Sequence, residues 1–507
     1  MNRDTSTIRE LIERQAARRP DAVFAMDDEG AQALTFEQLG AVCERVDTLL
    51  RAHGSQPGDT VSLVLPNGLM TLQLLLGALA GGWCVNPVNL LSQPTQMRYV
   101  LDHSDCKIVI VNAQWAPAVR EMLATLDRTV ALIVVEADAA RLPGAEVRRD
   151  VKSQISEVAA DSIALLMYTS GTTGVPKGVM LSQRNLVANA LAISAEHQLD
   201  ASDRVLAVLP LYHINAFAVT MLAPLAHGGS LVMPTKFSVA RFWDQAYLGN
   251  CTWINVVPTM ISYLLEAEVP APKQTERIRF CRSASAALAP DHLRAFEQKF
   301  GIGIIETMGL TETVAPAFSN PLEAARRKVG AVGLASGCEA RVIDADQVPV
   351  ADGATGEIAI RGPNVMRGYY KNDAATRDAF THNGWLRTGD LGMRDSDGFF
   401  FVTGRIKELI IKGGENIAPR EIDEALLRHP AVLDAAAVGI PDRHYGQEIM
   451  VCVVLRPRHQ ATEAALREFC VEHLGRFKTP KVIRFVNELP RGPSGKVQRL
   501  KLLEQNI

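Results

Sequence analysis

The chain has 507 residues, a formal net charge of −3 at pH 7 and a pI of about 6.4. This length predicts a large domain and at least one smaller one, and a hydrophobic content of 47% provides for a sizeable core. Because no basic stripe is present, the composition argues against binding to nucleic acid.

The first twenty residues are polar and lack the apolar core of a signal peptide. The most apolar stretch, residues 71–90, is broken by polar residues, glycines and Pro87, which is typical of a buried helix leading into a strand rather than a membrane span. The eight cysteines show no CxxC spacing, which favours free buried thiols over a zinc site. We expect a cytoplasmic protein without membrane insertion.

Short apolar runs alternate with helical patterns through the first 400 residues. Strands are expected at 60–65, 107–111, 131–135, 204–209, 252–257, 279–282 and 302–305, and helices at 70–79, 185–197 and 291–300. This alternation predicts an α/β fold with parallel sheets. Residues 329–401 are rich in glycine and in strand-forming residues, with turns at 352–353, 383–384 and 397–398, and they predict an antiparallel β-rich subdomain.

The pattern restarts after residues 404–407. Helices are expected at 419–429 and 463–474, and strands at 434–439, 449–455 and 482–485, which together predict a compact α+β module. We therefore expect a large N-terminal domain (1–403), a hinge (404–407) and a small, mobile C-terminal domain (408–507).

The run YTSGTTGVPKG, residues 168–178, follows an apolar strand pattern at 163–167. Glycines let a backbone approach a polyphosphate closely, and hydroxyls and N–H groups donate to its oxygens. A P-loop does not fit, because Pro176 removes an N–H before the lysine and Gly178 offers no hydroxyl to a metal. The run predicts a nucleotide-binding loop of another kind.

Four further clusters carry polar side chains after predicted strands or in loops. They are PLYHINAF (210–217), ETMGLTE (306–312), WLRTGD with VTGR (385–390 and 402–405) and RGPSGKVQR (491–499). Glu312 is a hard oxygen ligand suited to Mg²⁺, and Asp390 is suited to ribose hydroxyls. Each cluster alone also fits a structural role, such as a core histidine or a solvated loop lysine.

Four of these runs together, YTSGTTGVPKG, TGD (388–390), GRIKELIIKGGENI (404–417) and PSGKVQR (493–499), resemble those of the AMP-forming acyl-CoA synthetases. That adenylating superfamily includes luciferases and the adenylation domains of peptide synthetases. The resemblance covers nearly the whole chain. It implies a ligase that forms an acyl-adenylate from an acid and ATP, releases pyrophosphate, and then transfers the acyl group to coenzyme A with release of AMP.

The resemblance also implies roles for individual residues. ATP contacts would come from Thr169, Ser170, Gly171, Thr172, Thr173, Gly174, Lys177, Glu306, Thr307, Met308, Thr311, Asp390, Arg405 and Lys496, with Mg²⁺ on Glu312. The catalytic set would be Lys496, Thr311, Glu312 and His213, where His213 also gates the pantetheine tunnel. CoA would meet Lys412, Gly413, Gly414, Glu415 and Lys478, and Lys407 would be the hinge. Rotation of the small domain would exchange Lys496 for the CoA-binding segment.

Within the superfamily the chain resembles oxalate–CoA ligases, through FCRSASAALAP (280–290), SNPL (319–322), IRGPNV (360–365) and GRIKELI (404–410). The acyl group would meet His213, Arg282, Ser285 and Met308. Ala315 stands where oxalate ligases have a histidine, and Met308 stands where an aromatic residue usually stacks on adenine. We therefore expect a short anionic acid of the sulfoacetate, oxalate or malonate type, and sulfoacetate–CoA ligases belong to the same branch.

Several alternatives stay open from the sequence. The acid could be medium-chain or aromatic, the enzyme could load a carrier protein instead of CoA, and a luciferase-like oxygenase would share the first step. Whether Arg282 meets substrate or is structural is undecided. A homodimer is left open, and a lysine acetyltransferase and deacetylase could regulate Lys496, because acetylation removes its charge.

Overall fold

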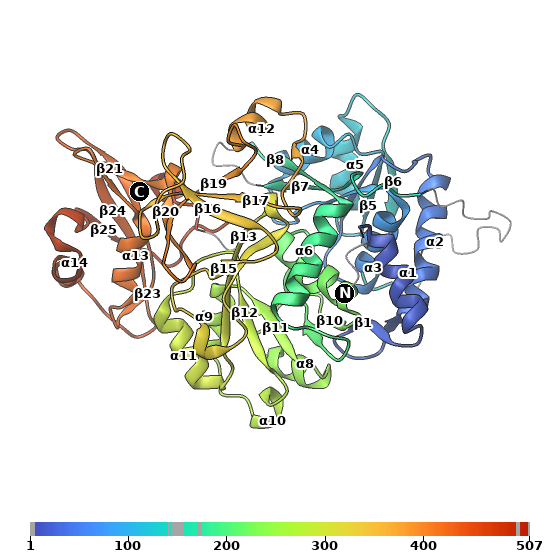
Figure 1. Ribbon diagram of the computed structural model, residues 1–507, viewed down its shortest axis with the longest axis horizontal. Coiled ribbons are helices and arrows are strands. Elements are labelled where there is room, and N and C mark those ends of the chain that lie inside the picture. The colour runs from blue at the N-terminus through green and yellow to red at the C-terminus, as the bar shows by residue number, and fades with distance from the viewer. Residues whose placement is uncertain (1–5, 140–141, 143–156, 170–174, 493–496, 505–507) are drawn as a thin grey trace.

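A computed structural model describes residues 6–139, 142, 157–169, 175–492 and 497–504 (Figure 1). Ser170, Gly171, Thr172, Thr173, Gly174 and Lys496, all predicted to contact ATP, lie outside the described residues. Of the described helices, none is both long and apolar enough to cross a bilayer. Disulfides are absent from the cysteines, of which seven are buried and Cys338 is half-buried.

A nine-stranded sheet carries the centre of the large domain, in the order β15-β14-β13-β12-β11-β9-β10-β1-β2. The six strands from β13 to β1 in this order run parallel, while β14, β15 and β2 pair antiparallel at the edges. Their bounds are β1 Val23–Asp27, β2 Ala33–Thr35, β9 Arg204–Leu206, β10 Ser230–Met233, β11 Trp253–Val256, β12 Phe280–Ser283, β13 Ile304–Leu310, β14 Ala315–Ser319 and β15 Leu334–Ala335.

A seven-stranded sheet has the order β18-β8-β7-β4-β3-β5-β6, with parallel pairing from β7 to β6 and antiparallel pairing at β8 and β18. Its bounds are β3 Thr60–Val64, β4 Cys84–Pro87, β5 Ile108–Val111, β6 Ala131–Val134, β7 Ile163–Thr169, β8 Lys177–Ser182 and β18 Gly368–Tyr369. The predicted parallel α/β layers are therefore confirmed.

Helices connect and cover these two sheets. They are α1 Ile8–Arg18, α2 Phe36–Ala52, α3 Leu69–Gly81, α4 Pro94–His103, α5 Ala116–Ala124, α6 Gln183–Glu196, the π-helix η1 Ala216–Leu222, α7 Ala223–His227, α8 Phe242–Leu248, α9 Pro258–Glu266, α10 Pro272–Thr275, α11 Pro290–Phe300 and α12 Asp373–Ala379. One core joins both sheets and includes α3, which is buried on all sides except at Gln73.

The β-rich part of the large domain is a four-stranded antiparallel sheet of β16 Glu339–Ile343, β17 Gly356–Arg361, β19 Leu386–Arg394 and β20 Phe400–Arg405. The three predicted turns carry their glycines at φ of 84°, 78° and 85°, which a glycine adopts without strain. The short helices η2 Thr311–Thr313, η3 Ala324–Arg326 and η4 Ile406–Glu408 lie in connections.

The last hundred residues form the lobe at the left of Figure 1. Its sheet contains β21 Ile410–Lys412, β22 Glu415–Ile417, β23 Val432–Asp442, β24 Gly446–Leu455 and β25 Val482–Phe485, with β25 parallel to β24 and the other pairs antiparallel. The helices are α13 Pro419–Leu427, α14 Glu463–Lys478 and α15 Lys501–Glu504, and a core separate from that of the two large sheets lies between α13, α14 and the sheet.

Two predicted strand boundaries are wrong. The strand predicted at 204–209 ends at Leu206. The strand predicted at 302–305 runs instead from Ile304 to Leu310, so the motif ETMGLTE lies mostly within it rather than after it. Residues 307–310 stay extended because β14 turns back and pairs with them.

Candidate functional site

The predicted acid-side residues lie where neighbouring parallel strands end. Arg282 is in β12, directly opposite Asn255 of β11 in the sheet register, and Ser285 follows β12 by two residues. His213 and Asn215 lie in the segment between β9 and η1. The carboxyl ends of adjacent parallel strands meet at one edge of a sheet, which is where open α/β sheets bind ligands.

Arg282 is fully buried and has only neutral partners. Its Nη1 donates to the side-chain oxygens of Asn215 and Asn255, each at 3.3 Å, and its Nη2 donates to the Thr307 hydroxyl at 2.7 Å. The buried Nε has no hydrogen-bond partner among the residues described. Burial lowers the pKa of Arg282 to about 9, and no carboxylate of the described residues offsets this, so Arg282 is a cation at neutral pH without a counter-charge from that part of the chain.

A chain of hydrogen bonds leads from this cation to Ser285. The Asn215 oxygen accepts from Arg282, and the Asn215 amide donates to the Ser285 hydroxyl at 3.4 Å. Ser285 is half-buried and has a φ of 74°, a left-handed conformation that is uncommon outside glycine. Because the Ser285 oxygen accepts from Asn215, this bond does not use the proton of the Ser285 hydroxyl.

His213 is half-buried and lies edge-on against Tyr212, with ring centroids 4.7 Å apart. Asn67 holds this segment by accepting from the backbone of Leu211 at 2.9 Å and donating to the carbonyl of Leu209 at 2.9 Å. The segment is thus fixed from the end of β3.

The predicted ribose pair is in contact across two strands. Asp390 of β19 and Arg405 of β20 are direct partners in the register, and the Arg405 Nε donates to the Asp390 Oδ1 at 2.6 Å. Burial alone would lower the pKa of Arg405, but the adjacent carboxylate of Asp390 raises it above its usual value. Asp390 is buried in this pair, so the structure brings the two residues together as predicted, although a ribose contact stays a prediction.

Glu312 and Lys177 both contact one tyrosine. The hydroxyl of Tyr369 donates to the Glu312 Oε1 at 2.8 Å, and the Lys177 Nζ lies 4.8 Å from the centre of the Tyr369 ring. Thr311 precedes Glu312 in η2. Tyr369 thus brings together a cation and a carboxylate that were both predicted to serve the phosphates, one at the start of β8 and the other just after the end of β13.

Other residues predicted to bind ATP lie along β13. Thr307 is buried, and its hydroxyl accepts from Arg282 and donates to the Ser283 carbonyl at 3.3 Å. Met308 packs against the core of the four-stranded sheet. Burial raises the pKa of Glu306 to about 7, and the backbone N–H of Gly330 limits the shift.

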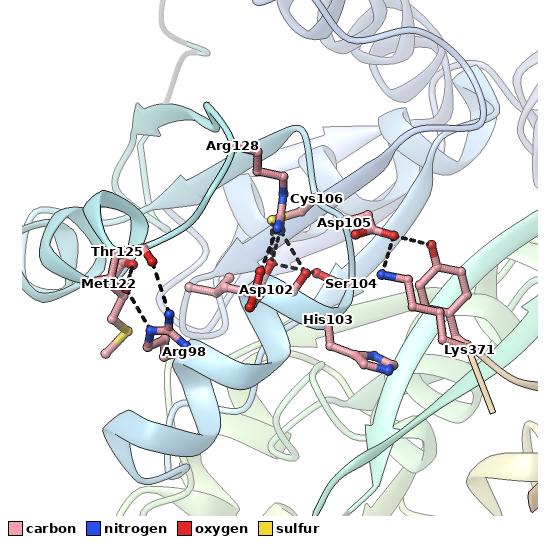
Figure 2. A network of polar contacts seen from close by, with 12 residues as sticks. Arg98, Asp102, His103, Ser104, Asp105, Cys106, Met122, Thr125, Arg128 and Lys371 are labelled. Carbon is pink, nitrogen blue, oxygen red and sulfur yellow. Dashed lines mark hydrogen bonds and ion pairs between the residues drawn. The ribbon is translucent and has the colours of Figure 1, made fainter.

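A polar network lies at the end of α4 (Figure 2). The His103 Nδ1 lies 2.8 Å from the hydroxyl of Tyr168, which is the penultimate residue of β7. Asp105 accepts from Tyr370 at 2.7 Å and pairs with Lys371 at 2.6 Å. The network therefore contacts the residue directly before Thr169, which is the last residue of β7 and the first of the predicted loop.

In the small lobe, Gly413 and Gly414 form the two-residue turn of the β21–β22 hairpin, with φ of 58° and 87°. Lys412 is buried, pairs with Glu448 at 2.5 Å and donates to the Phe477 carbonyl at 2.8 Å. Its side chain is therefore engaged within the lobe, and a contact of Lys412 with CoA stays a prediction.

The remaining predicted residues lie near the lobe's edges. Lys478 pairs with Glu421 at 2.7 Å, and Glu415 and Lys407 are exposed. Arg499, three residues after Lys496, donates to Glu408 at 3.1 Å and also pairs with Asp423. This ties the segment that follows Lys496 to the residues next to the predicted hinge.

Sequence reasoning missed Asn215, Asn255 and Tyr369. The signal for Asn255 was available, because a polar residue in the apolar strand WINV lies opposite another buried polar residue, Arg282. Tyr369 gave no such signal, since its partners are 57 and 192 residues away in the chain.

Two family models match the chain: "AMP-binding enzyme" over residues 12–370 and "AMP-binding enzyme C-terminal domain" over residues 421–496. The chain is 56% identical to the sulfoacetate–CoA ligase of Cupriavidus necator, over 98% of this chain and 97% of the relative. It is 34% identical to the oxalate–CoA ligase of Arabidopsis thaliana, over 98% of both.

Among solved structures, the ATP-bound MatB of Rhodopseudomonas palustris superposes with a TM-score of 0.91 at 30% identity, over 98% of both chains. The apo form of MatB, at the same identity and coverage, superposes with a TM-score of 0.79. The arrangement of the present chain is therefore more similar to the ATP-bound form than to the apo form.

Proposed function

This chain belongs to the family of AMP-binding enzymes, and we propose that its acid is sulfoacetate or another short acid carrying a second anionic group. It is an ATP-dependent acid–CoA ligase that works through an acyl-adenylate. The 56% identity to a sulfoacetate–CoA ligase over nearly the full length of both chains supports this choice of acid.

The observation that carries the proposal is the buried guanidinium of Arg282, which has no carboxylate partner among the described residues. Burying an unpaired charge is costly. A substrate with a second anion would supply the missing counter-charge, and in a site of low dielectric this attraction acts over more than a contact distance. A fatty or plain aromatic acid would leave the cation uncompensated.

The hydrogen-bond chain from Arg282 through Asn215 to Ser285 would be polarised by the cation, which would strengthen the bond that Ser285 donates to the substrate. We infer that the Ser285 hydroxyl donates to the distal sulfonate or carboxylate, while Arg282 acts from beneath. His213 would line the opposite side. Together they recognise a short dianion by position as well as by charge.

For the nucleotide, we propose that Thr169–Lys177 hold the β- and γ-phosphates, that Asp390 and Arg405 hold the ribose, and that Thr311 contacts the α-phosphate. Lys496 would place its charge where the carboxylate and the α-phosphate meet, so that it stabilises the negative charge of the transition state. Glu312 offers a hard oxygen to Mg²⁺, which prefers one or two carboxylates together with phosphate oxygens and would neutralise charge on the triphosphate.

For the second step, we propose that residues 1–403 and 408–507 rotate about 404–407, with Lys407 as the pivot. Rotation would withdraw Lys496 and bring the Gly413–Gly414 turn, Glu415 and Lys478 to the thiol of CoA. We further propose a cytoplasmic location, where ATP and CoA are available, and control by acetylation of Lys496, which would remove its charge.

The test is a panel of acids assayed by CoA-dependent release of AMP, with wild type and Arg282→Met. Sulfoacetate, malonate and oxalate should exceed acetate and octanoate. Arg282→Met should lower kcat/KM for the preferred dianion roughly 10- to 100-fold, the range expected when a charge-assisted interaction is lost, and should leave the rate with acetate nearly unchanged. Arg277→Met, an exposed arginine nearby, is the control.

A preference for octanoate over every short dianion would refute the proposed substrate. An equal loss with acetate and with the dianion in Arg282→Met would show that Arg282 only supports the fold.

A further inference from the structure

Tyr369 is placed by two independent constraints. It lies in β18 at the edge of the seven-stranded sheet, opposite Val179 of β8. Its backbone N–H donates to the Thr376 hydroxyl of α12 at 2.9 Å. An added Cβ on the preceding Gly368, which has a φ of 142°, would lie 2.8 Å from a Thr376 side-chain atom. The tyrosine is therefore fixed from both neighbouring elements.

The side chain uses its hydroxyl and its ring for opposite charges. The hydroxyl donates to the Glu312 Oε1 at 2.8 Å, and the Lys177 ammonium lies over the ring at 4.8 Å from its centre. A cation within about 6 Å of an aromatic face is attracted by the ring electrons. Neither Glu312 nor Lys177 forms an ion pair within the described parts of the chain, so this tyrosine is the contact that they share.

The chemistry of this arrangement fits a nucleotide carrying a metal. A phenol hydroxyl is a hydrogen-bond donor at neutral pH, so Tyr369 donates to the Glu312 carboxylate. Its hydrogen bond occupies one carboxylate oxygen and leaves the other for a hard cation. Over the residues that the structure describes, no cluster of three or more acidic, histidine or cysteine ligands could hold a metal by itself. A single oriented carboxylate, completed by phosphate oxygens, is consistent with that result.

We propose that Tyr369 is a positioning residue that orients Glu312 toward Mg²⁺ through its hydroxyl and holds Lys177 toward the triphosphate through its ring. This inference rests on the ATP roles proposed above for Glu312 and Lys177. The hydroxyl and the ring have different functions in this proposal. A mutation that removes only the hydroxyl therefore tests the first function without the second.

The experiment is calorimetric titration of ATP into the full-length protein, with Mg²⁺ and with EDTA. Tyr369→Phe loses the hydroxyl and keeps the ring. Its affinity for MgATP should fall about 10-fold, as expected when a partner that orients a metal ligand is removed, while its affinity for ATP in EDTA should not change. Tyr369→Leu loses both contacts and should weaken binding under both conditions.

Tyr263→Phe is the control, because it removes the hydroxyl of an exposed tyrosine in α9 that has no predicted role in binding. It should bind MgATP as the wild type does. Thermal unfolding of each variant shows whether the fold is kept, and if Tyr369→Leu does not fold, Tyr369→Phe alone decides the inference.

Equal MgATP affinity in Tyr369→Phe and wild type would overturn the assignment. So would an equal loss with Mg²⁺ and with EDTA in that variant. Failure of the proposed substrate is a separate result, because wild type would then still bind MgATP while turning over none of the short dianions.

Discussion

A buried guanidinium without a carboxylate is costly, and Arg282 is held by three neutral side chains, those of Asn215, Asn255 and Thr307. Thr307 shows the consequence for sequence-based reasoning. Its type and motif predict a nucleotide contact, but its hydroxyl is engaged by Arg282 and by the Ser283 carbonyl. Thr307, predicted to contact the nucleotide, therefore stabilises Arg282, predicted to contact the acid.

Glu306 gives a prediction about pH and stability. Burial raises its pKa in the folded protein to about 7, against an ordinary value of 4.5. Between these pH values the folded state binds more protons than the unfolded state, so the stabilisation from this group is complete below pH 4.5 and is lost as pH rises through 7. Glu306→Gln does not titrate and should escape this loss.

The measurement is the melting temperature from pH 5 to pH 8. The stability of Glu306→Gln relative to wild type should increase across this range, by about 3 kcal/mol at most. Glu339→Gln, which replaces an exposed glutamate paired with Arg361, should show a difference that does not depend on pH. A constant difference for Glu306→Gln as well would show that Glu306 is already ionised at pH 5.

At the scale of elements, the β21–β22 hairpin is specified by its two central residues. Lys412 and Glu415 pair directly, and the two residues between them both have positive φ, which a two-residue turn of this kind requires. An added Cβ on Gly414 would meet no atom within 4 Å, so the cost of a substitution there comes only from the positive φ of the backbone.

Gly414→Ala should therefore cost about 1–2 kcal/mol in the hairpin conformation. If the hairpin serves CoA, thioester formation from supplied acyl-adenylate should fall while ATP–pyrophosphate exchange persists. Gly414→Asn should recover part of the loss, because asparagine tolerates positive φ. Gly353→Ala is the matched control, since Gly353 has a φ of 84° and an equally open Cβ position in a distant turn. A similar loss of thioester formation in that control would show that the effect is not specific to the hairpin, and would contradict its role in the CoA step.

The alternation of apolar runs and helical patterns was sufficient to predict the central elements of both large sheets. Such runs are buried on both faces and read clearly from hydrophobicity. The end of β9 was missed because apolar residues continue to Leu209 after the pairing stops at Leu206. The extension of β13 was missed because it depends on β14, a pairing that no local pattern in ETMGLTE reveals.

The same limit applies to the candidate site. Arg282, Ser285, Glu312, Asp390 and Arg405 could be named from motifs, since their local runs are distinctive. Asn215 and Asn255 could not be assigned to Arg282 from the sequence, because the strand register brings Asn255 to it and the fold of the segment before η1 brings Asn215. Tyr369 meets Glu312 and Lys177 only through the fold.

At the scale of the whole molecule, two arginines of the small lobe make polar contacts with the large one among the residues that the structure describes. The Arg420 Nη1 of α13 donates to the Val402 carbonyl of β20 at 2.7 Å, and Arg456 pairs with Glu266 of α9 at 3.4 Å. The second pair is partly exposed, and such pairs contribute little stability. Breaking such an exposed pair costs little free energy, which would favour the rotation of the small domain proposed above.

Lys407→Pro tests the exchange directly. Lys407 lies in η4, between β20 of the large domain and β21 of the small one. Proline fixes φ near −65° and restricts the residue before it, so the segment should be held in one arrangement. ATP–pyrophosphate exchange should then be retained, while thioester formation should fall roughly 100-fold or more, as expected when reacting groups cannot reach their geometry. Lys407→Ala, which leaves the backbone free to rotate, should retain both steps. Thioester formation at the wild-type rate in the proline variant would place the pivot elsewhere, and an equal loss of both steps would point to a disturbed fold instead of a blocked rotation.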